Sequence, residues 1–106
     1  MRTYTDPETV DVAAGERFIV ALSGNAVGGY EWQVADSGDA ELLAADIEPG
    51  AAGLPGEAGT ARFSFAASGP GRTTLAFALK RRWEDEALRT HRVEVLVRGA
   101  PYPPGG

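Results

Sequence analysis

Apolar residues recur along this chain at every second position, and clusters of glycine or proline interrupt the alternation at short intervals. A period of two is typical of half-buried β-strands, because successive side chains of a strand point to opposite faces. The alternation is clear in six segments, residues 9–12, 17–22, 30–34, 61–66, 73–80 and 91–98. It predicts a shared core that contains Trp32, Phe63, Phe65, Leu75, Phe77, Val93 and Val95.

A seventh segment, residues 41–47, fits two structures. Leu43, Ala45 and Ile47 alternate as they would in a strand, but residues 41–45 are also good helix formers that follow a possible cap at Asp39. We predict a strand with a helical turn before it.

Short strands joined by glycine-rich connections fit an antiparallel sandwich, because a parallel sheet would need crossover helices. We therefore predict an all-β fold, an antiparallel immunoglobulin-like β-sandwich of seven or eight strands. The chain has no cysteine, so the disulfide of antibody domains is excluded, and we expect aliphatic residues and Phe63 or Phe65 to pack Trp32. Residues 1–98 are expected to form one domain, and the Pro/Gly-rich residues 99–106 a fraying tail.

Composition narrows the range of functions. The formal net charge is -5, which argues against a nucleic-acid partner or an anionic membrane, since both require a concentrated basic surface. Without cysteine, the chain can hold neither a thiol nucleophile nor a thiolate-bound metal. It has no segment with the apolar length of a signal peptide or a membrane span, so as written we expect a soluble, unexported monomer, although a trimmed chain would look the same.

Catalytic and metal-binding patterns are weak. His91 is the single histidine, it shares a strand face with Val93 and Val95, and no serine or carboxylate forms an evident relay with it, so we expect a structural role. Residues 36–41 have the acidic density of a calcium loop but not its spacing, which indicates an exposed turn. The sequence thus predicts a protein that is not an enzyme, with no catalytic residue, no cofactor and no metal.

Three connections stand out as candidates for binding. The first is "GNAVGG" at residues 24–29, the second is "PGAAGLPGEAG" at 49–59, and the third follows "LKRRW" at 79–83. If the strands run up and down in order, all three open at one end of the sandwich, where functional loops on a rigid scaffold commonly gather.

These segments resemble a known family. "GNAVGGYEW" is similar to the Asn-Pro-Thr-Thr-Gly-(Tyr/Phe)-x-Trp loop of the chagasin-like inhibitors of papain-family cysteine peptidases, and "RRW" at residues 81–83 is similar to their Arg-Pro-Trp loop. The glycine-rich middle loop, and the strand, turn and strand that lead to the third loop, occur in the same order and at similar separations. The resemblance covers roughly residues 15–97.

The resemblance implies a competitive inhibitor that wedges three loops into the cleft of a papain-like cysteine peptidase and is not cleaved. The first loop would lie over the catalytic centre, the middle loop on the side that receives the residues before the scissile bond, and the third loop on the other side, with Trp83 as the aromatic contact. The implied contact residues are Asn25, Ala26, Val27, Gly28, Gly29 and Tyr30; Gly53, Leu54, Pro55, Gly56, Glu57, Ala58 and Gly59; and Arg81, Arg82 and Trp83.

This sequence departs from the family pattern at four of these positions. Ala26, Val27 and Gly28 stand where the pattern has Pro-Thr-Thr, and Arg82 stands where it has proline. Loss of the prolines predicts loops that are less preorganised, hence weaker or retuned inhibition. The alternative is a non-inhibitory immunoglobulin-like module that binds another protein or forms part of an assembly, in which Asn25 and Gly29 merely shape a connection between strands.

The two tryptophans are expected to differ. Trp32 shares a strand face with Tyr30 and Val34, so we predict that Trp32 is scaffold and that Tyr30 supports the first loop or fills the core edge. Trp83 lies between "KRR" and "EDE", whose charges favour water, so we predict that it is exposed. The alternative is an indole folded over the end of the sandwich and held by a cation–π contact with a neighbouring arginine.

Overall fold

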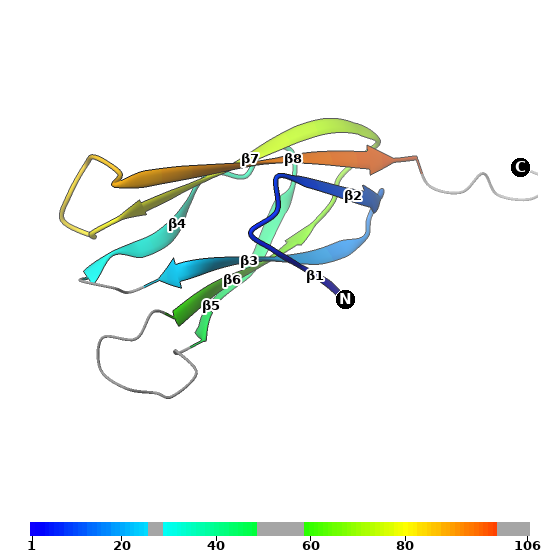
Figure 1. Ribbon diagram of the computed structural model, residues 1–106. Helices are drawn as coiled ribbons and strands as arrows, with labels where there is room; N and C mark the ends of the chain where they lie inside the picture. Colours follow the sequence, from blue (N-terminus) through cyan, green and yellow to red (C-terminus); the bar gives the residue numbers. More distant parts are fainter. Residues whose placement is uncertain (26–28, 49–58, 100–106) are drawn as a thin grey trace, which may run out of the picture.

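The computed structural model describes residues 1–25, 29–48 and 59–99, and eight strands run through them (Figure 1). The sequence favours strands in these places because β-branched and aromatic residues alternate there with polar ones. The strands are β1 (Arg2–Thr5), β2 (Thr9–Ala13), β3 (Arg17–Asn25), β4 (Glu31–Asp36), β5 (Glu41–Glu48), β6 (Gly59–Ala66), β7 (Gly71–Lys80) and β8 (Arg89–Arg98).

The strands form two layers. One sheet has the order β1-β3-β6-β5 and the other the order β2-β8-β7-β4, which together make the predicted immunoglobulin-like β-sandwich. The pairs β3–β6, β5–β6, β4–β7 and β7–β8 are antiparallel, whereas the pairs β1–β3 and β2–β8, which hold the two N-terminal strands, are parallel. Parallel pairing is possible here without a crossover helix, because the chain between each pair passes through the opposite sheet.

The N-terminal strand β1 is the element that the alternation missed. The chain leaves β1 at Asp6, whose backbone takes a φ of 46° and whose N–H donates to the carbonyl of Ala21 at 2.8 Å. It then crosses to the edge of the second sheet and continues as β2. Pro7 suits this crossing since it has no N–H to pair. The first strand therefore completes one sheet and the second strand completes the other.

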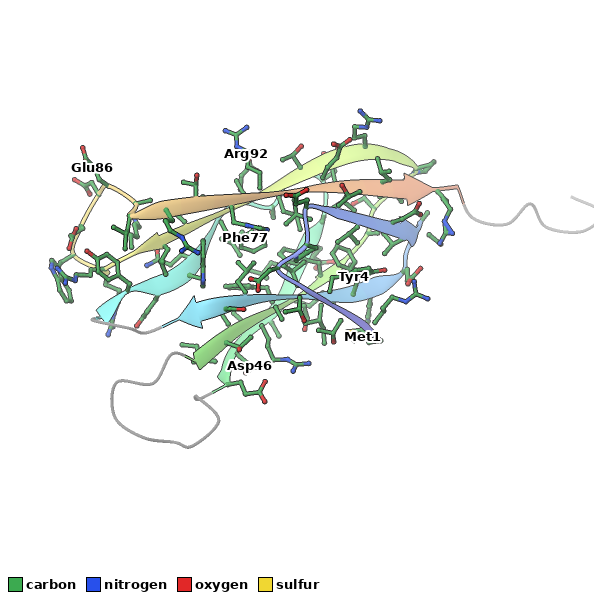
Figure 2. The ribbon with its side chains drawn as sticks, in the orientation of Figure 1. Met1, Tyr4, Asp46, Phe77, Glu86 and Arg92 are labelled. Carbon is green, nitrogen blue, oxygen red and sulfur yellow. The ribbon has the colours of Figure 1, made fainter. Side chains whose placement is uncertain are left out.

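The core lies between the two sheets. All seven residues predicted for it are buried, and they are joined by Val10, Val12, Phe18, Val20 and Leu22 from β2 and β3. The phenylalanines pack as a group, with Phe18 stacked on Phe65 and Phe63 against Phe77. Figure 2 shows Phe77 pointing from β7 toward the facing sheet. This apolar interior fixes the strands rigidly enough to position the loops at their ends.

The edge strand β5 confirms the predicted strand at residues 41–47 but not its predicted alternation. A bulge between Leu42 and Ala44 shifts the register, so that Leu42 opposes Phe65 and Ala45 opposes Phe63 on β6. Opposed residues share a face of the sheet, so Leu42 lies on the face of Ala45, and Leu43 falls at the bulge, where the regular alternation is interrupted. Every residue of this strand is exposed. A turn precedes it, in which the N–H of Ala40 donates to the carbonyl of Ser37 at 3.0 Å.

No helix in the described ranges is long and apolar enough to span a bilayer. The tail predicted at residues 99–106 lies outside the described residues except for Gly99.

Candidate functional site

The register of the strands brings the three candidate connections to one end of the sandwich. Asn25 at the end of β3 pairs with Gly59 at the start of β6, and Glu31 at the start of β4 pairs with Lys80 at the end of β7. β7 and β8 are themselves joined at this end. The strand ends that flank the first, middle and third loops therefore lie together, on the left in Figure 1.

Trp83 in the connection from β7 to β8 is presented to solvent, with 75% of its surface exposed. This confirms the prediction made from the charges on either side of it. An indole is large and rigid, so its exposure gives this end of the fold a preformed apolar contact surface.

Gly29 links the first loop to the third. Its φ is +84°, a conformation that glycine adopts without strain, and a Cβ placed on it would lie 3.7 Å from Cη2 of Trp83 and 3.9 Å from the Arg81 side chain. The backbone of the first loop thus lies directly against the third loop. The sequence predicted that the two loops share an end of the sandwich, and the geometry adds that they touch.

Arg81 is held within the protein. Its guanidinium carbon lies 4.5 Å from the centroid of the Tyr30 ring, and its Nη1 pairs with Glu84 at 3.2 Å. The N–H of Glu84 also donates to the Arg81 carbonyl at 3.1 Å, which closes a tight turn around Trp83. Tyr30 is thus a cation–π partner of Arg81, and it packs against the core as predicted.

Trp32 lies beneath the first loop and is 6% exposed, as predicted for a scaffold residue. Its Nε1–H donates to the carbonyl of Ser23 at 2.8 Å, which ties β4 to the end of β3. The indole also meets the His91 ring edge-on at 6.3 Å and the Arg89 guanidinium at 5.9 Å. Trp32 thereby connects β4 both to the end of β3 and to β8.

Asp6 and His91 extend this support to the N-terminal crossing. The N–H of Ser23 donates to Oδ1 of Asp6 at 3.0 Å, and the Ser23 hydroxyl donates to Oδ2. Nε2 of His91 lies 2.6 Å from the Pro7 carbonyl, so this nitrogen carries the proton and donates it. His91 has the structural role predicted for it. The sequence did not single out Asp6, although an Asp-Pro pair is a recognised turn signal that marks it.

Several predicted contact residues lie outside the described residues, namely Ala26, Val27 and Gly28 of the first loop and Gly53, Leu54, Pro55, Gly56, Glu57 and Ala58 of the middle loop. Those that the structure brings together are the backbones of Asn25 and Gly59, and the group of Gly29, Tyr30, Arg81 and Trp83. Arg82, next to Trp83, is exposed. The described part of the site is thus one aromatic surface with glycine backbone beside it.

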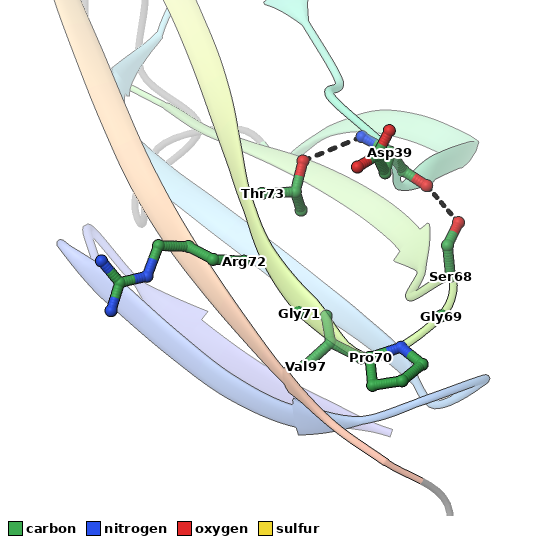
Figure 3. Close-up of a pocket in the computed structure, with 8 residues that line it drawn as sticks. All are labelled: Asp39, Ser68, Gly69, Pro70, Gly71, Arg72, Thr73 and Val97. Carbon is green, nitrogen blue, oxygen red and sulfur yellow. Dashed lines mark hydrogen bonds between the residues drawn. The ribbon is translucent and has the colours of Figure 1, made fainter.

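A pocket of about 130 Å³ lies at the opposite end, where β7 begins and β8 ends (Figure 3). Its polar groups are paired across it: the Ser68 hydroxyl donates to the Asp39 carbonyl, and the Asp39 N–H donates to Oγ1 of Thr73 at 2.9 Å. These contacts close the turn before β5. The pocket is therefore part of the scaffold and lies far from the three loops.

Among the described residues, no group of His, Asp or Glu side chains is arranged to hold a metal ion. Several solved structures resemble the fold, among them EhICP2, amebosin and PbICP-C. The crystal structure of the cysteine protease inhibitor EhICP2 from Entamoeba histolytica matches with a TM-score of 0.71 at 22% identity, over 92% of this chain and 97% of that one. The solution structure of amebosin matches with a TM-score of 0.64 at 27% identity and the same coverage. PbICP-C, in its complex with falcipain-2, matches with a TM-score of 0.54 at 17% identity, over 93% and 92% of the two chains.

A search of curated protein sequences finds no match. The family model described as "Chagasin family peptidase inhibitor I42" matches residues 11–96, which is most of the chain. On that match, and with a fold shared with solved cysteine protease inhibitors, the chain belongs to the chagasin family of peptidase inhibitors.

Proposed function

We propose that this protein inhibits papain-like cysteine peptidases reversibly, by inserting three loops from one end of the sandwich into the active-site cleft without being cleaved. The first loop, Asn25 to Tyr30, covers the catalytic centre. The middle loop, Gly53 to Gly59, and the third loop, Arg81 to Trp83, lie on the two sides of it.

The observation that carries the proposal is the exposed Trp83, packed against Gly29 of the first loop at the end where all three connections leave the sheets. A buried indole would have removed the main contact of the third loop. An exposed aromatic residue that is already fixed in place loses little entropy on binding, which is the property of an interface hot spot.

The physical mechanism requires no chemistry from the inhibitor. Glycine at position 29, with its φ of +84°, lets the backbone of the first loop pack closely beside Trp83, so the two loops are presented as one surface. The Trp32 and Asp6 contacts hold the strands that carry this loop, so the loop is presented from a rigid base. Such a wedge excludes substrate simply by occupying the cleft.

The descriptions of two structural neighbours support a cysteine peptidase as the partner. EhICP2 is described as a cysteine protease inhibitor, and PbICP-C was solved in a complex with falcipain-2. A stable complex between inhibitor and peptidase is the outcome that we propose for this chain as well.

The proposal is tested by titrating a panel of papain-like cysteine peptidases with the pure protein and measuring residual activity. We expect reversible inhibition of at least one enzyme, intact inhibitor after prolonged incubation, and competition with a small covalent inhibitor that occupies the catalytic cysteine. Val27→Asp should abolish inhibition, because it would drive a charge into a desolvated catalytic centre.

If no peptidase of the panel is inhibited at micromolar protein, the proposal fails, and a non-inhibitory binding module becomes the better interpretation. Unchanged binding of the protein to a peptidase whose catalytic cysteine is already blocked by the covalent inhibitor would instead refute the assignment of the first loop to the catalytic centre.

A further inference from the structure

The two adjacent arginines of the third loop have different surroundings. Arg81 stacks on Tyr30 and pairs with Glu84, so its charge is balanced inside the protein. Arg82 is exposed, and no described residue offers its guanidinium a hydrogen bond or an ion pair. Only the second of the two cations is therefore available to another molecule.

Arg82 is also next to the main apolar contact of the loop. Trp83 is 75% exposed, and the turn closed by Arg81 and Glu84 holds it in place. Arg82 and Trp83 are adjacent within this turn, so a partner that buries the indole also comes close to Arg82. The guanidinium would then lose water, which is unfavourable unless the partner supplies an acceptor.

The acceptor that suits a guanidinium best is a carboxylate, which can accept two parallel N–H donors. A wall with neutral or basic side chains would leave the cation desolvated and unpaired, and the complex would be penalised. Specificity arises from that difference between partners.

We infer that Arg82 is a specificity-determining residue, which selects those papain-like cysteine peptidases whose cleft wall carries carboxylates beside the groove that receives Trp83. The inference rests on the proposed function, since it names which members of the proposed partner class are bound. It also gives a physical reason for an arginine at a loop position where proline would be stiffer.

The acidic residues that follow in the same loop provide a second test, in which the expected change in the association rate has the opposite sign. Glu86 projects from the part of the loop that returns toward β8 (Figure 2). A carboxylate-bearing wall attracts Arg82 and repels Glu86, so the two substitutions Arg82→Ala and Glu86→Gln should change the association rate in opposite directions.

The experiment compares the wild-type protein with Arg82→Ala, Arg82→Glu, Glu86→Gln and the matched control Arg92→Ala. Like Arg82, Arg92 is an exposed arginine, but it projects from the outer face of β8, away from the loop end (Figure 2). Inhibition constants and association rates are measured against two groups of papain-like peptidases, one with an acidic and one with a neutral or basic wall beside the cleft, at low and high salt.

We expect the wild type to prefer the acidic-walled group, and Arg82→Ala to slow association with that group by about fivefold at low salt and by less than about twofold at high salt. Arg82→Glu should reverse the preference, Glu86→Gln should speed association, and Arg92→Ala should leave the preference unchanged. If a peptidase whose wall carboxylate is replaced by lysine binds the Arg82→Glu variant again, the experiment identifies directly the carboxylate that pairs with Arg82.

Two results would overturn the inference in different ways. If the wild type inhibits peptidases but Arg82→Ala and Arg92→Ala change both groups equally, the proposed function stands and the role of Arg82 is wrong. If the wild type inhibits no peptidase in either group, the proposed function and the inference fail together.

Discussion

The two tryptophans of this chain have opposite surroundings in one region of the fold. Trp32 is 6% exposed and donates a hydrogen bond to the end of β3, whereas Trp83 is 75% exposed and rests on Gly29 of the first loop. The first fixes the strands that carry the loops, and the second is available to a partner. One tryptophan thus serves the stability of the scaffold and the other is placed for binding, and substitutions can test this difference.

The largest effect is expected for Trp32→Ala. Removal of a buried indole leaves a cavity and an unpaired Ser23 carbonyl, so the free energy of unfolding should fall by about 3–5 kcal/mol. Urea denaturation followed by circular dichroism measures it. Trp32→Phe, which keeps an aromatic ring but no N–H donor, should lose less, and equal losses for the two variants would contradict a contribution from the packing of the ring.

Trp83→Ala should separate binding from stability. We expect inhibition of a sensitive peptidase to weaken by about 2 kcal/mol or more, as for an aromatic hot spot. The free energy of unfolding should change by no more than about 0.5 kcal/mol, because the side chain is exposed. Titration of the peptidase and urea denaturation of the same sample give both values. A variant that unfolds as readily as Trp32→Ala would show that the two tryptophans do not differ in role.

Asp6→Ala tests the support beneath the first loop at a distance from the indole. It removes the acceptor for both donors of Ser23 and places alanine at a φ of 46°, so the unfolding free energy should fall by about 1–2 kcal/mol. Asp6→Asn is the matched control, since asparagine tolerates this φ and keeps one acceptor. An equally low melting temperature for both variants would contradict the claim that part of the loss comes from placing alanine at this φ.

Arg81→Ala is expected to have a small effect on stability, about 0.5–1 kcal/mol, because it removes a partly exposed cation–π contact and a partly exposed ion pair. Arg82→Ala should change the unfolding free energy by less than that. Denaturation curves of the two variants measured side by side decide the point, and identical curves would mean that Arg81 is no more structural than its neighbour.

The family match bears on the chemistry of the protein. The prediction that the chain is not an enzyme agrees with its membership of a family of peptidase inhibitors. Two of its described polar side chains have structural partners: His91 contacts the Pro7 carbonyl, and Asp6 accepts from Ser23. These pairs stiffen the base of the loops, which is what the proposed insertion of the loops into a cleft requires.

Local patterns alone determined the interior and one exposed residue. The alternation in residues 61–66, 73–80 and 91–98 marked the inward face correctly, because a strand that is buried on one side must place apolar side chains at every second position. The exposure of Trp83 followed from the charges on either side of it. The order of "GNAVGGYEW" and "RRW" was enough to identify the family.

Tertiary structure decided what depends on residues distant in the sequence. A bulge in β5 set its register against β6, and the parallel pairing of β1 with β3 followed from a crossing at Asp6. The different surroundings of Arg81 and Arg82 also depend on a residue outside their own segment. The ring of Tyr30, directly before β4, contacts the guanidinium of Arg81 and not that of Arg82. Alternation reports only whether a side chain is buried; which partner it meets is set by how the strands are brought together, and that is a property of the assembled sandwich.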